Sequence, residues 1–564
     1  MKIKGLLLGM FACAALVACT NDDIVESTGG NENGTEVPAY VTLSFTAKTT
    51  GDGRAVVEDP TDPENTNITN AGTVNESNVK SLALLIGDEM VKVYDESALA
   101  AAFTAVNGVY TSNDPIKVTA GTKEIIVILN PTTAVAAAFA TVNGAKEAIA
   151  SGTFTGDTYA EAIAGVTGGT NMDAFMMGNR EKVTVVATSA NTETNPVIAN
   201  VNVERAVAKI MFRTTTDNTY TVPITTEKTE HVSQEVGETA YYKATDQNGA
   251  EVWYTTADGV VTGVYSISGS TVTELTKWNG EGATPPAGTY YTLADGKELN
   301  YIKTTNTLTE DLTITLNGYL ISNLQKTGYN VRHISTDGAT GTAFGLLNGT
   351  NYLFDPFFTQ KNAANVADED FDFGALFFTP FADMDAATAT FEAMPTGDDE
   401  STTTGDDRGV GAFMKYCFEN AAVPAMQKHG YSTSITFKAT AKLRNEPFEG
   451  YFYKNAYYKT EADLISSNPG VTASTEGVAH FADGICYYTA QIKHSDNGLE
   501  GTMGNMEFAI VRNNIYSLSV SALNKIGDAT VDPDPTVDDE TGDGYIKLSV
   551  TILPWVVRYN NIEF

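Results

Sequence analysis

The chain has 564 residues, 42% of them hydrophobic and 10% aromatic, which is enough to build several buried cores. Acidic residues outnumber basic ones by 70 to 35, and the net charge of −35 argues against binding to nucleic acid or to anionic lipid surfaces. Four cysteines without a C-x-x-C pair exclude a dense disulfide framework, and five scattered histidines indicate neither a metal site nor a cofactor. The 49 glycines and 26 tyrosines favour short strands joined by many turns.

The N-terminus has the pattern of an export signal. Two lysines precede an apolar run, Gly5 to Ala18, which is too short to span a bilayer and predicts a secretory signal. The run ends in Leu16-Val17-Ala18-Cys19, which resembles a bacterial lipoprotein box. That resemblance implies a signal peptide over residues 1–18 and acyl chains on Cys19 that anchor the exported chain to a membrane. The alternative is a plain signal peptide in which Cys19 is incidental.

The first predicted strand follows a polar tether. Tyr40 to Lys48 alternates with period two, which is typical of a half-buried strand. The apolar side chains expected on its buried face are Val41, Leu43, Phe45 and Ala47. The strand ends in a Gly- and Asp-rich segment that contains a single arginine, Arg54, in a position open to a protease.

A first β domain is predicted to follow and to end at residue 213. Its Ala-rich stretch Ala134–Ala150 predicts a helix, which Gly144 disfavours. Runs of β-branched and aliphatic residues predict strands at Lys80–Ile86, Glu124–Leu129, Lys182–Ala187 and Val201–Phe212.

A second β domain is predicted over residues 214–530. Its first part, 214–307, is rich in Thr, Tyr and Gly, which favours an insertion of extra hairpins. Phe413–Gln427 predicts a helix that a proline interrupts. The clearest strands are expected at Thr433–Leu443 and Asn514–Leu523.

The chain ends in an unusual arrangement of a charged segment and an apolar strand. Residues 531–544 contain six acidic residues and two prolines, which predicts an extended, solvated linker. An apolar strand outside the domain has no evident partner in its own fold, and an uncovered strand invites aggregation. We therefore expect another chain to accept residues 545–564, whose apolar positions are Ile546, Leu548, Val550, Ile552 and Trp555.

Several motifs give the chain a resemblance to the Bacteroidales fimbrillins, the subunits of type V pili. The C-terminal third carries the most specific of them. The motifs are Arg205 to Lys209, Tyr416 to Asn420, Arg512 to Tyr516, Lys525 to Gly527, the Asp-Pro-Asp-Pro of the linker, and the stretch from Pro554-Trp555 to Asn561-Ile562-Glu563-Phe564.

The resemblance implies an all-β fold of two transthyretin-like β-sandwiches with few short helices. It also implies a lipoprotein precursor at the outer membrane and an Arg- or Lys-specific protease that cuts between Arg54 and Ala55. Loss of the first strand would open a groove, and the C-terminal strand of another copy would fill it. The implied segments are signal peptide 1–18, propeptide 19–54, domains 55–213 and 214–530, linker 531–544 and donor strand 545–564.

The predicted leaving and donor strands match each other. Each carries four apolar residues at period two, so either could occupy one groove in the same phase. Because both Arg54 and a full donor strand are present, the polymerising stalk subunit of a fimbria used for adhesion, colonisation and biofilm formation is the favoured role. The implied partners are copies of the same chain, anchor and tip subunits, and the protease.

Two other classes of function remain open, together with one question of covalent structure. The chain could be a lipid-anchored surface adhesin, or an accessory or tip subunit, that never polymerises. Acidic clusters such as Asp368 to Asp372 could serve a secreted carbohydrate-active enzyme, but acidic loops are expected on an acidic protein, and we predict no enzyme and no cofactor. Cys417 and Cys486 either pair after export or stay as buried thiols.

Overall fold

The computed structural model describes most of the chain after the N-terminal region. None of the helices within this part is long and apolar enough to cross a membrane. The described residues are 37–46, 78–106, 108–155, 175–213, 217–257, 260–278, 286–294, 297–345, 347, 350–395, 411–454, 456–468, 470–495, 497–499, 501–541 and 546–554.

The N-terminal part is built on a sheet of ten described strands. Its main strand order is β3-β2-β7-β9-β11-β1-β5-β4, while β10 pairs with β7 and β6 pairs with β1. The strands are β1 Pro38–Thr46, β2 Leu82–Ile86, β3 Met90–Tyr94, β4 Phe103–Val106, β5 Val109–Ser112, β6 Ile116–Thr119, β7 Gly121–Leu129, β9 Met177–Asn179, β10 Val183–Ala187 and β11 Val197–Arg205.

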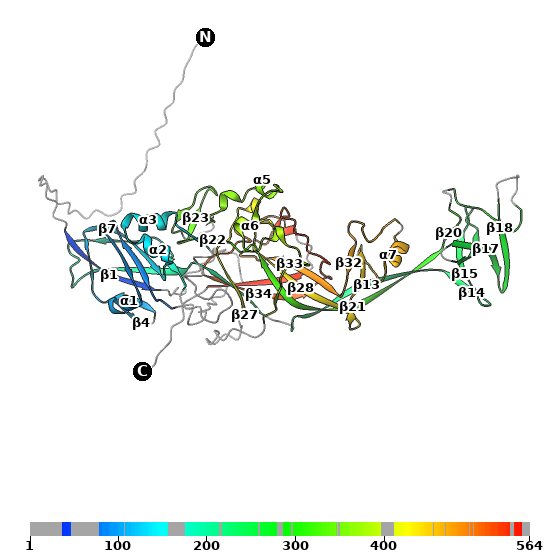
Figure 1. Cartoon of the computed structure of the whole chain (residues 1–564), viewed down its shortest axis with the longest axis horizontal. Coiled ribbons are helices and arrows are strands. Elements are labelled where there is room, and N and C mark those ends of the chain that lie inside the picture. Colours follow the sequence, from blue (N-terminus) through cyan, green and yellow to red (C-terminus); the bar gives the residue numbers. More distant parts are fainter. Residues whose placement is uncertain are drawn as a thin grey trace, which may run out of the picture.

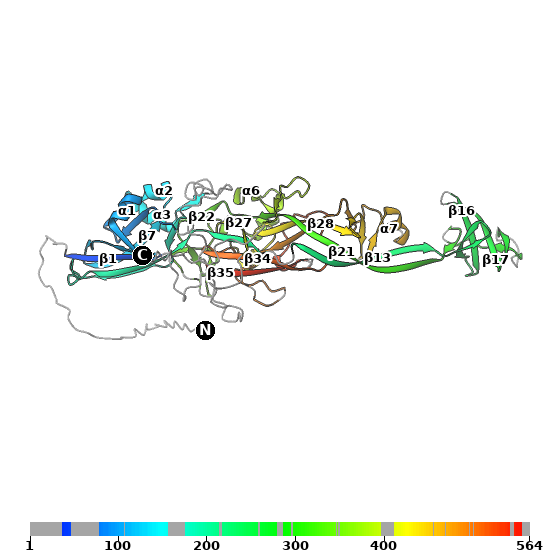
Figure 2. The ribbon, with the colours of Figure 1, turned by 90° about the horizontal axis from the view of Figure 1, so that it is seen from below.

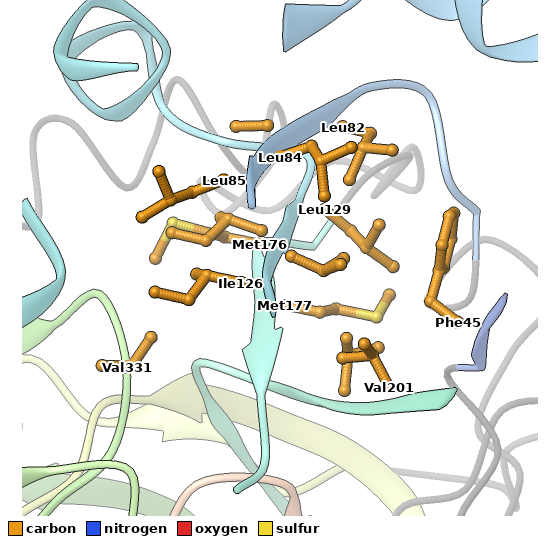
Figure 3. Packing of buried hydrophobic residues seen from close by; sticks show 14 of the residues in the cluster. Phe45, Leu82, Leu84, Leu85, Ile126, Leu129, Met176, Met177, Val201 and Val331 are labelled. Atoms are coloured by element: carbon orange, nitrogen blue, oxygen red, sulfur yellow. The ribbon is translucent and has the colours of Figure 1, made fainter. Parts of the chain in front are cut away.

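One apolar cluster fills this part of the molecule. Phe45 of β1, Val201 of β11 and Leu84 of β2 are all fully buried in it, although β2 lies four places from β1 in the strand order. The sheet therefore folds around its own core, as Figure 3 shows for side chains from β1, β2, β7 and β11.

The chain crosses from the first sheet to the second at Ala206 and Val207. The sequence predicts one long strand over Val201–Phe212, which is wrong. β11 ends at Arg205, and β12 Ala208–Phe212 belongs to a different sheet of four described strands, in the order β27-β12-β34-β35. The alternation of the sequence continues through this point because both strands bury apolar side chains, so the pattern alone does not show the change of sheet.

The second half packs this small sheet against a larger one. Residues of β12 and β34 share a core with residues of β13, β21 and β28. The remaining strands of the four-stranded sheet are β27 Ala412–Cys417, β34 Asn514–Leu523 and β35 Ile546–Pro554. The larger sheet contains β13 Thr219–His231, β21 Lys303–Ser322, β26 Glu392–Ala393, β28 Ser434–Leu443, β29 Glu446–Pro447, β30 Gly450–Tyr453, β31 Ala456–Tyr458, β32 Ala479–Phe481 and β33 Ile485–Gln491.

Two long strands carry a separate head to the far end of the molecule. β13 and β21 pair in antiparallel register from Thr219↔Thr315 to His231↔Lys303, a ribbon of roughly 40 Å at 3.4 Å per residue. Figures 1 and 2 show the head beyond this ribbon, at the opposite end from β1. It has its own small core, which confirms the hairpin insertion expected in 214–307. Its strands are β14 Ser233–Val236, β15 Thr239–Thr245, β16 Glu251–Ala257, β17 Val260–Ser268, β18 Thr271–Lys277, β19 Thr289–Tyr290 and β20 Asn300–Tyr301.

The helices are short, and two helix predictions need correction. Ala134–Ala150 forms two helices rather than one, because the hydroxyl of Thr141 accepts a hydrogen bond from Gly144 N–H and caps a new helix start. Phe413–Gln427 is mainly β27 and a short 3₁₀ turn, since pairing with β12 outweighs helix propensity. The helices are α1 Glu96–Ala102, α2 Thr133–Ala138, α3 Val142–Ala150, α5 Ala363–Val366, α6 Phe373–Leu376 and α7 Glu461–Ser467.

The remaining described elements are small. β8 pairs with β22, and β23 pairs with β24 and β25. These strands are β8 Thr153–Thr155, β22 Thr327–Tyr329, β23 His333–Ser335, β24 Thr342–Ala343 and β25 Tyr352–Leu353, and the 3₁₀ turns are Phe358–Gln360, Phe381–Asp383, Pro424–Met426 and Asp539–Thr541.

Because the head has its own core, we predict that the head can be removed without unfolding the rest of the protein. Val232 N–H donates to the carbonyl of Ile302, so replacing residues 233–301 by an Asn-Gly turn closes the ribbon as a hairpin. We expect the body to fold and its melting temperature to change by no more than about 4 °C, measured by circular dichroism. Loss of the folded body would show that the head supports the larger core.

Candidate functional site

β1 occupies a slot between strands on both sides. It runs parallel to β11, with Val41 opposite Val197 and Thr46 opposite Asn202, and antiparallel to β5 and β6. Val41, Leu43 and Phe45 are fully buried, so the predicted period-two pattern and half-buried strand are confirmed in these residues. A strand here therefore supplies both backbone hydrogen bonds to its neighbours and one face of the N-terminal core.

The deepest contact of β1 is aromatic. The ring of Phe45 stacks on Tyr110 with centroids 5.0 Å apart, and it meets the edge of Phe103 at 5.4 Å. Figure 3 shows Phe45 with Val201 at one side of the core. Removing β1 would expose this apolar surface and leave β11 without one of its neighbours.

The C-terminal strand β35 lies at the edge of the second sheet. It pairs antiparallel with β34, with Val550 opposite Leu518 and Ile552 opposite Tyr516, and the register shifts between Val520 and Ala522. The expectation that this strand has no partner within its own fold is wrong. A subunit by itself gains backbone hydrogen bonds by covering the edge of β34, whose partner on the other side is β12.

The acidic segment before β35 is docked rather than fully solvated. His429 N–H donates to the carbonyl of Val537 at 3.0 Å, and Gly430 N–H donates to that of Pro535 at 3.1 Å. Asp539 is buried, with 5% exposure, which contradicts the prediction of a purely solvated linker. The sequence pattern missed this contact because the acceptors are backbone carbonyls, which carry no compositional signal.

Asn513 holds the crossing point between the two sheets. Its N–H donates to the carbonyl of Val207 at 2.7 Å, and its side-chain oxygen accepts from the N–H of Arg205 at 3.2 Å. Asn513 has a positive φ of 60°, a conformation that asparagine tolerates better than most residues. The start of β34 is thereby fixed to the short connection between β11 and β12.

Two buried ion pairs flank this crossing point. Arg332 contacts Glu204 at 2.6 Å, and Arg512 contacts Glu419 at 2.6 Å, with every side chain at most 2% exposed. Burial lowers the pKa of Arg512, but Glu419 and Glu204 outweigh it and raise that pKa, so the guanidinium stays charged. Arg512 also donates to the carbonyl of Tyr329 at 2.9 Å. This bond ties a third segment to the crossing point, which forms the junction between the two sheets.

Only some of the predicted site residues lie within the part of the chain that the structure describes. Cys19, Arg54, Ala55, Ala47 and Trp555 lie outside the described residues. The two predicted strands are present but are not neighbours, because β1 belongs to the first sheet and β35 to the second.

The sequence motifs include several residues of the junction, but the sequence did not predict the contacts that these residues make. Arg205 and Glu419 lie in the sequence motifs of the fimbrillin resemblance. The ion pair between Glu204 and Arg332 was not predicted from the sequence. Buried charges within otherwise apolar strands were the available signal.

Other chemistry-bearing groups are explained by packing. Cys417 and Cys486 are free, buried thiols, and burial raises the pKa of Cys486 to about 12. His494 Nδ1 lies 2.7 Å from the Tyr516 hydroxyl, and burial lowers its pKa to about 3. Across the described ranges, no group of three or more His, Cys, Asp or Glu side chains is arranged to hold a metal ion.

Arg512, Asn513 and the last described strand, β35, lie in a segment that matches a known family. Residues 479–561 match the family model for the major fimbrial subunit protein type IV, fimbrillin, C-terminal domain. These residues are therefore similar to the C-terminal domain of a fimbrillin. The resemblance predicted from the sequence is confirmed there, and the fimbrillin segment includes β34, the docked acidic segment and β35.

Comparisons with solved structures and with curated sequences complete this picture. The fimbrilin (fimA) of Porphyromonas gingivalis W83 is 13% identical over 92% of this chain and 98% of its own, with a TM-score of 0.33. The C-terminally truncated tip fimbrial protein Mfa3 of Porphyromonas gingivalis is 10% identical over 92% of this chain and 100% of its own, with a TM-score of 0.32. No curated protein sequence matches the chain.

The buried pair at the junction gives a prediction about stability. Replacing Arg512 by Met leaves the Glu419 carboxylate buried without its partner, which should lower the free energy of unfolding by about 3–5 kcal/mol. The double variant Arg512→Met with Glu419→Leu should recover most of that loss, because neither charge remains. Urea unfolding of both variants measures the difference. Equal stability of the single and double variants would show that the pair does not hold the junction.

Proposed function

We propose that this protein is the polymerising stalk subunit of a fimbria and that copies assemble by strand exchange. The observation that supports it best is that the chain has two apolar strands with the same period-two pattern, one in the interior of a sheet and one at the edge of another. β1 fills a buried slot in the first sheet, and β35 covers only an edge in the second. A strand at an edge can leave with the loss of one ladder, whereas the slot of β1 offers two ladders to any strand that replaces it.

The energetics favour exchange once β1 is removed. The slot receives side chains that are fully buried, at about 1.5–3 kcal/mol each. The sequence predicts four such side chains on each strand, with a combined gross gain of roughly 6–12 kcal/mol before ordering costs. This is sufficient for a stable polymer without a disulfide.

The proposal requires processing of the precursor. Cys19 would carry the lipid that holds the precursor at the outer membrane, and an Arg- or Lys-specific protease would cut between Arg54 and Ala55. That cut lies after β1 in the sequence, so it separates the strand from the domain that it fills. The mature subunit would then reside in a surface fimbrium, joined to copies of itself and to anchor and tip subunits. Adhesion, colonisation and biofilm formation are its proposed roles.

Processing gives the first test. Mass spectrometry of fimbriae sheared from cells should show a mature N-terminus at Ala55. Arg54→Ala should hold the subunit on the membrane as an unpolymerised precursor, with Arg213→Ala as the control. A sheared chain that still begins at lipidated Cys19 would contradict the stalk role and favour a lipid-anchored adhesin.

The donor strand gives the second test. Leu548→Asp with Val550→Asp would place two carboxylates in an apolar slot, where each unpaired charge costs several kcal/mol. Ser549→Asp with Thr551→Asp adds the same charge at the alternate positions and is the matched control. Oligomer ladders on unheated denaturing gels should vanish for the first variant and persist for the second, with folding of both checked by circular dichroism. Identical ladders would contradict strand exchange.

A further inference from the structure

The acidic segment that leads to β35 is held to one turn of the body by four hydrogen bonds and one ion pair. Besides the bonds from His429 and Gly430, Asp539 N–H donates to the carbonyl of Gln427 at 3.2 Å, and Lys428 Nζ donates to that of Thr536 at 3.1 Å. Lys428 also forms an ion pair with Asp538. This docked segment, residues 535–540, ends a few residues before β35 begins.

The turn is shaped to let the segment approach closely. A Cβ added at Gly430 would lie 2.6 Å from Cβ of Pro535 and 3.0 Å from its carbonyl oxygen. Real side chains do not tolerate the first of these separations, so Gly430 permits the contact. The docking is thus a fitted contact rather than a chance approach of two loops.

Asp539 is the one member of the docked segment whose charge is hard to accommodate. Its side chain is almost fully buried, and within the described part of the chain neither carboxylate oxygen has a well-formed hydrogen bond. The pKa of Asp539 is raised from the ordinary 3.8 to about 8, chiefly by burial and also by Asp538, although Ser432 and Lys428 act to lower it. The docked segment therefore favours the protonated carboxyl at neutral pH.

The other charged groups around the docked segment do not share this property. Asp534 has its pKa lowered, chiefly by the Thr536 hydroxyl and N–H. Burial lowers the pKa of His429, although Asp534, Asp538 and Asp532 raise it, so the ring is neutral over most of the relevant range.

On the other side of Asp539, Glu540 is paired with Lys493 at 3.0 Å and accepts from Gly501 N–H at 2.7 Å. Lys493 also contacts the buried Glu507 at 3.1 Å. Burial raises the pKa of Glu507, so Glu507 is the second group that could titrate near the segment, and the experiment must separate it from Asp539.

We propose that residues 535–540 form a proton-sensitive latch on the C-terminal strand, closed when Asp539 is protonated and loosened when it ionises. The latch holds the segment that leads into β35, and so it controls how readily that strand leaves the edge of β34. This regulatory role rests on the proposed strand exchange, whereas the opening of the latch itself is a property of the single subunit.

The direction of the pH effect follows from proton linkage. The docked state binds the Asp539 proton more tightly than the undocked state, so this contribution to docking is complete below about pH 4. It is lost as the pH rises towards 8 and changes little above that. A difference of one bound proton makes the opening equilibrium rise about tenfold per pH unit across that window.

Hydrogen exchange of the unpolymerised precursor tests the latch. The measurement follows the backbone amides of 427–430 and 536–541 at pH 5 to 9 and compares each variant with the wild type at the same pH. Asp539→Asn keeps the shape without the charge, so it should protect these amides more than the wild type does. The ratio should widen about tenfold per pH unit up to about pH 8. Asp532→Asn, which removes an exposed carboxylate outside the docked segment, is the control and should show no such widening.

Two further arms give the outcomes that decide the proposal. A ratio independent of pH for Asp539→Asn, or the same widening in Asp532→Asn or Glu507→Gln, would overturn the latch. In subunits that have been cut between Arg54 and Ala55, Asp539→Asn should also slow the formation of oligomer ladders at pH 8. If the latch responds to pH but no condition gives ladders, the strand-exchange function fails while the latch stands. If ladders form at equal rates in both proteins, the control of assembly by the latch is refuted.

Discussion

The molecule depends on a single constraint: the backbone of every sheet must find hydrogen-bond partners, including at its edges. One stretch of chain meets that need in two sheets at once, because β11 lies beside β1 and β12 lies beside β34. Asn513 fixes the short connection between them. The slot that holds the first strand and the edge that holds the last are therefore joined by a nearly continuous line of strands. A pull on either end would load backbone hydrogen bonds along this line.

The buried ion pairs make that connection specific rather than merely strong. Removing paired charges from water is costly, so Glu204–Arg332 and Glu419–Arg512 contribute little net stability compared with an apolar core. They do, however, penalise any other packing of the two halves, because a shift would leave a charge buried and unpaired.

The sequence was informative where a pattern is local and weak where a contact is distant. The alternation of Val41, Leu43 and Phe45 predicted β1 and its buried face, since period two is set by the strand itself. The prediction of a helix over Phe413–Gln427 was wrong because the strand that pairs with β27 lies some two hundred residues earlier in the chain.

The candidate site shows the same division between local and distant contacts. The apolar residues of β35 were recognisable, but its place beside β34 was not, because an edge strand can satisfy its backbone in its own subunit or in another. The docking of Asp539 was invisible for a related reason, as its partners are carbonyl and amide groups that every residue carries.

The head at the end of the β13–β21 ribbon has a consequence for how such a protein can change over time. Among the described residues, its core shares no buried side chain with the two large clusters, so substitutions within it alter neither the slot of β1 nor the edge of β34. This region can therefore change in sequence while the rest of the sequence stays under the demands of folding. The head is the part of this molecule best placed to diversify.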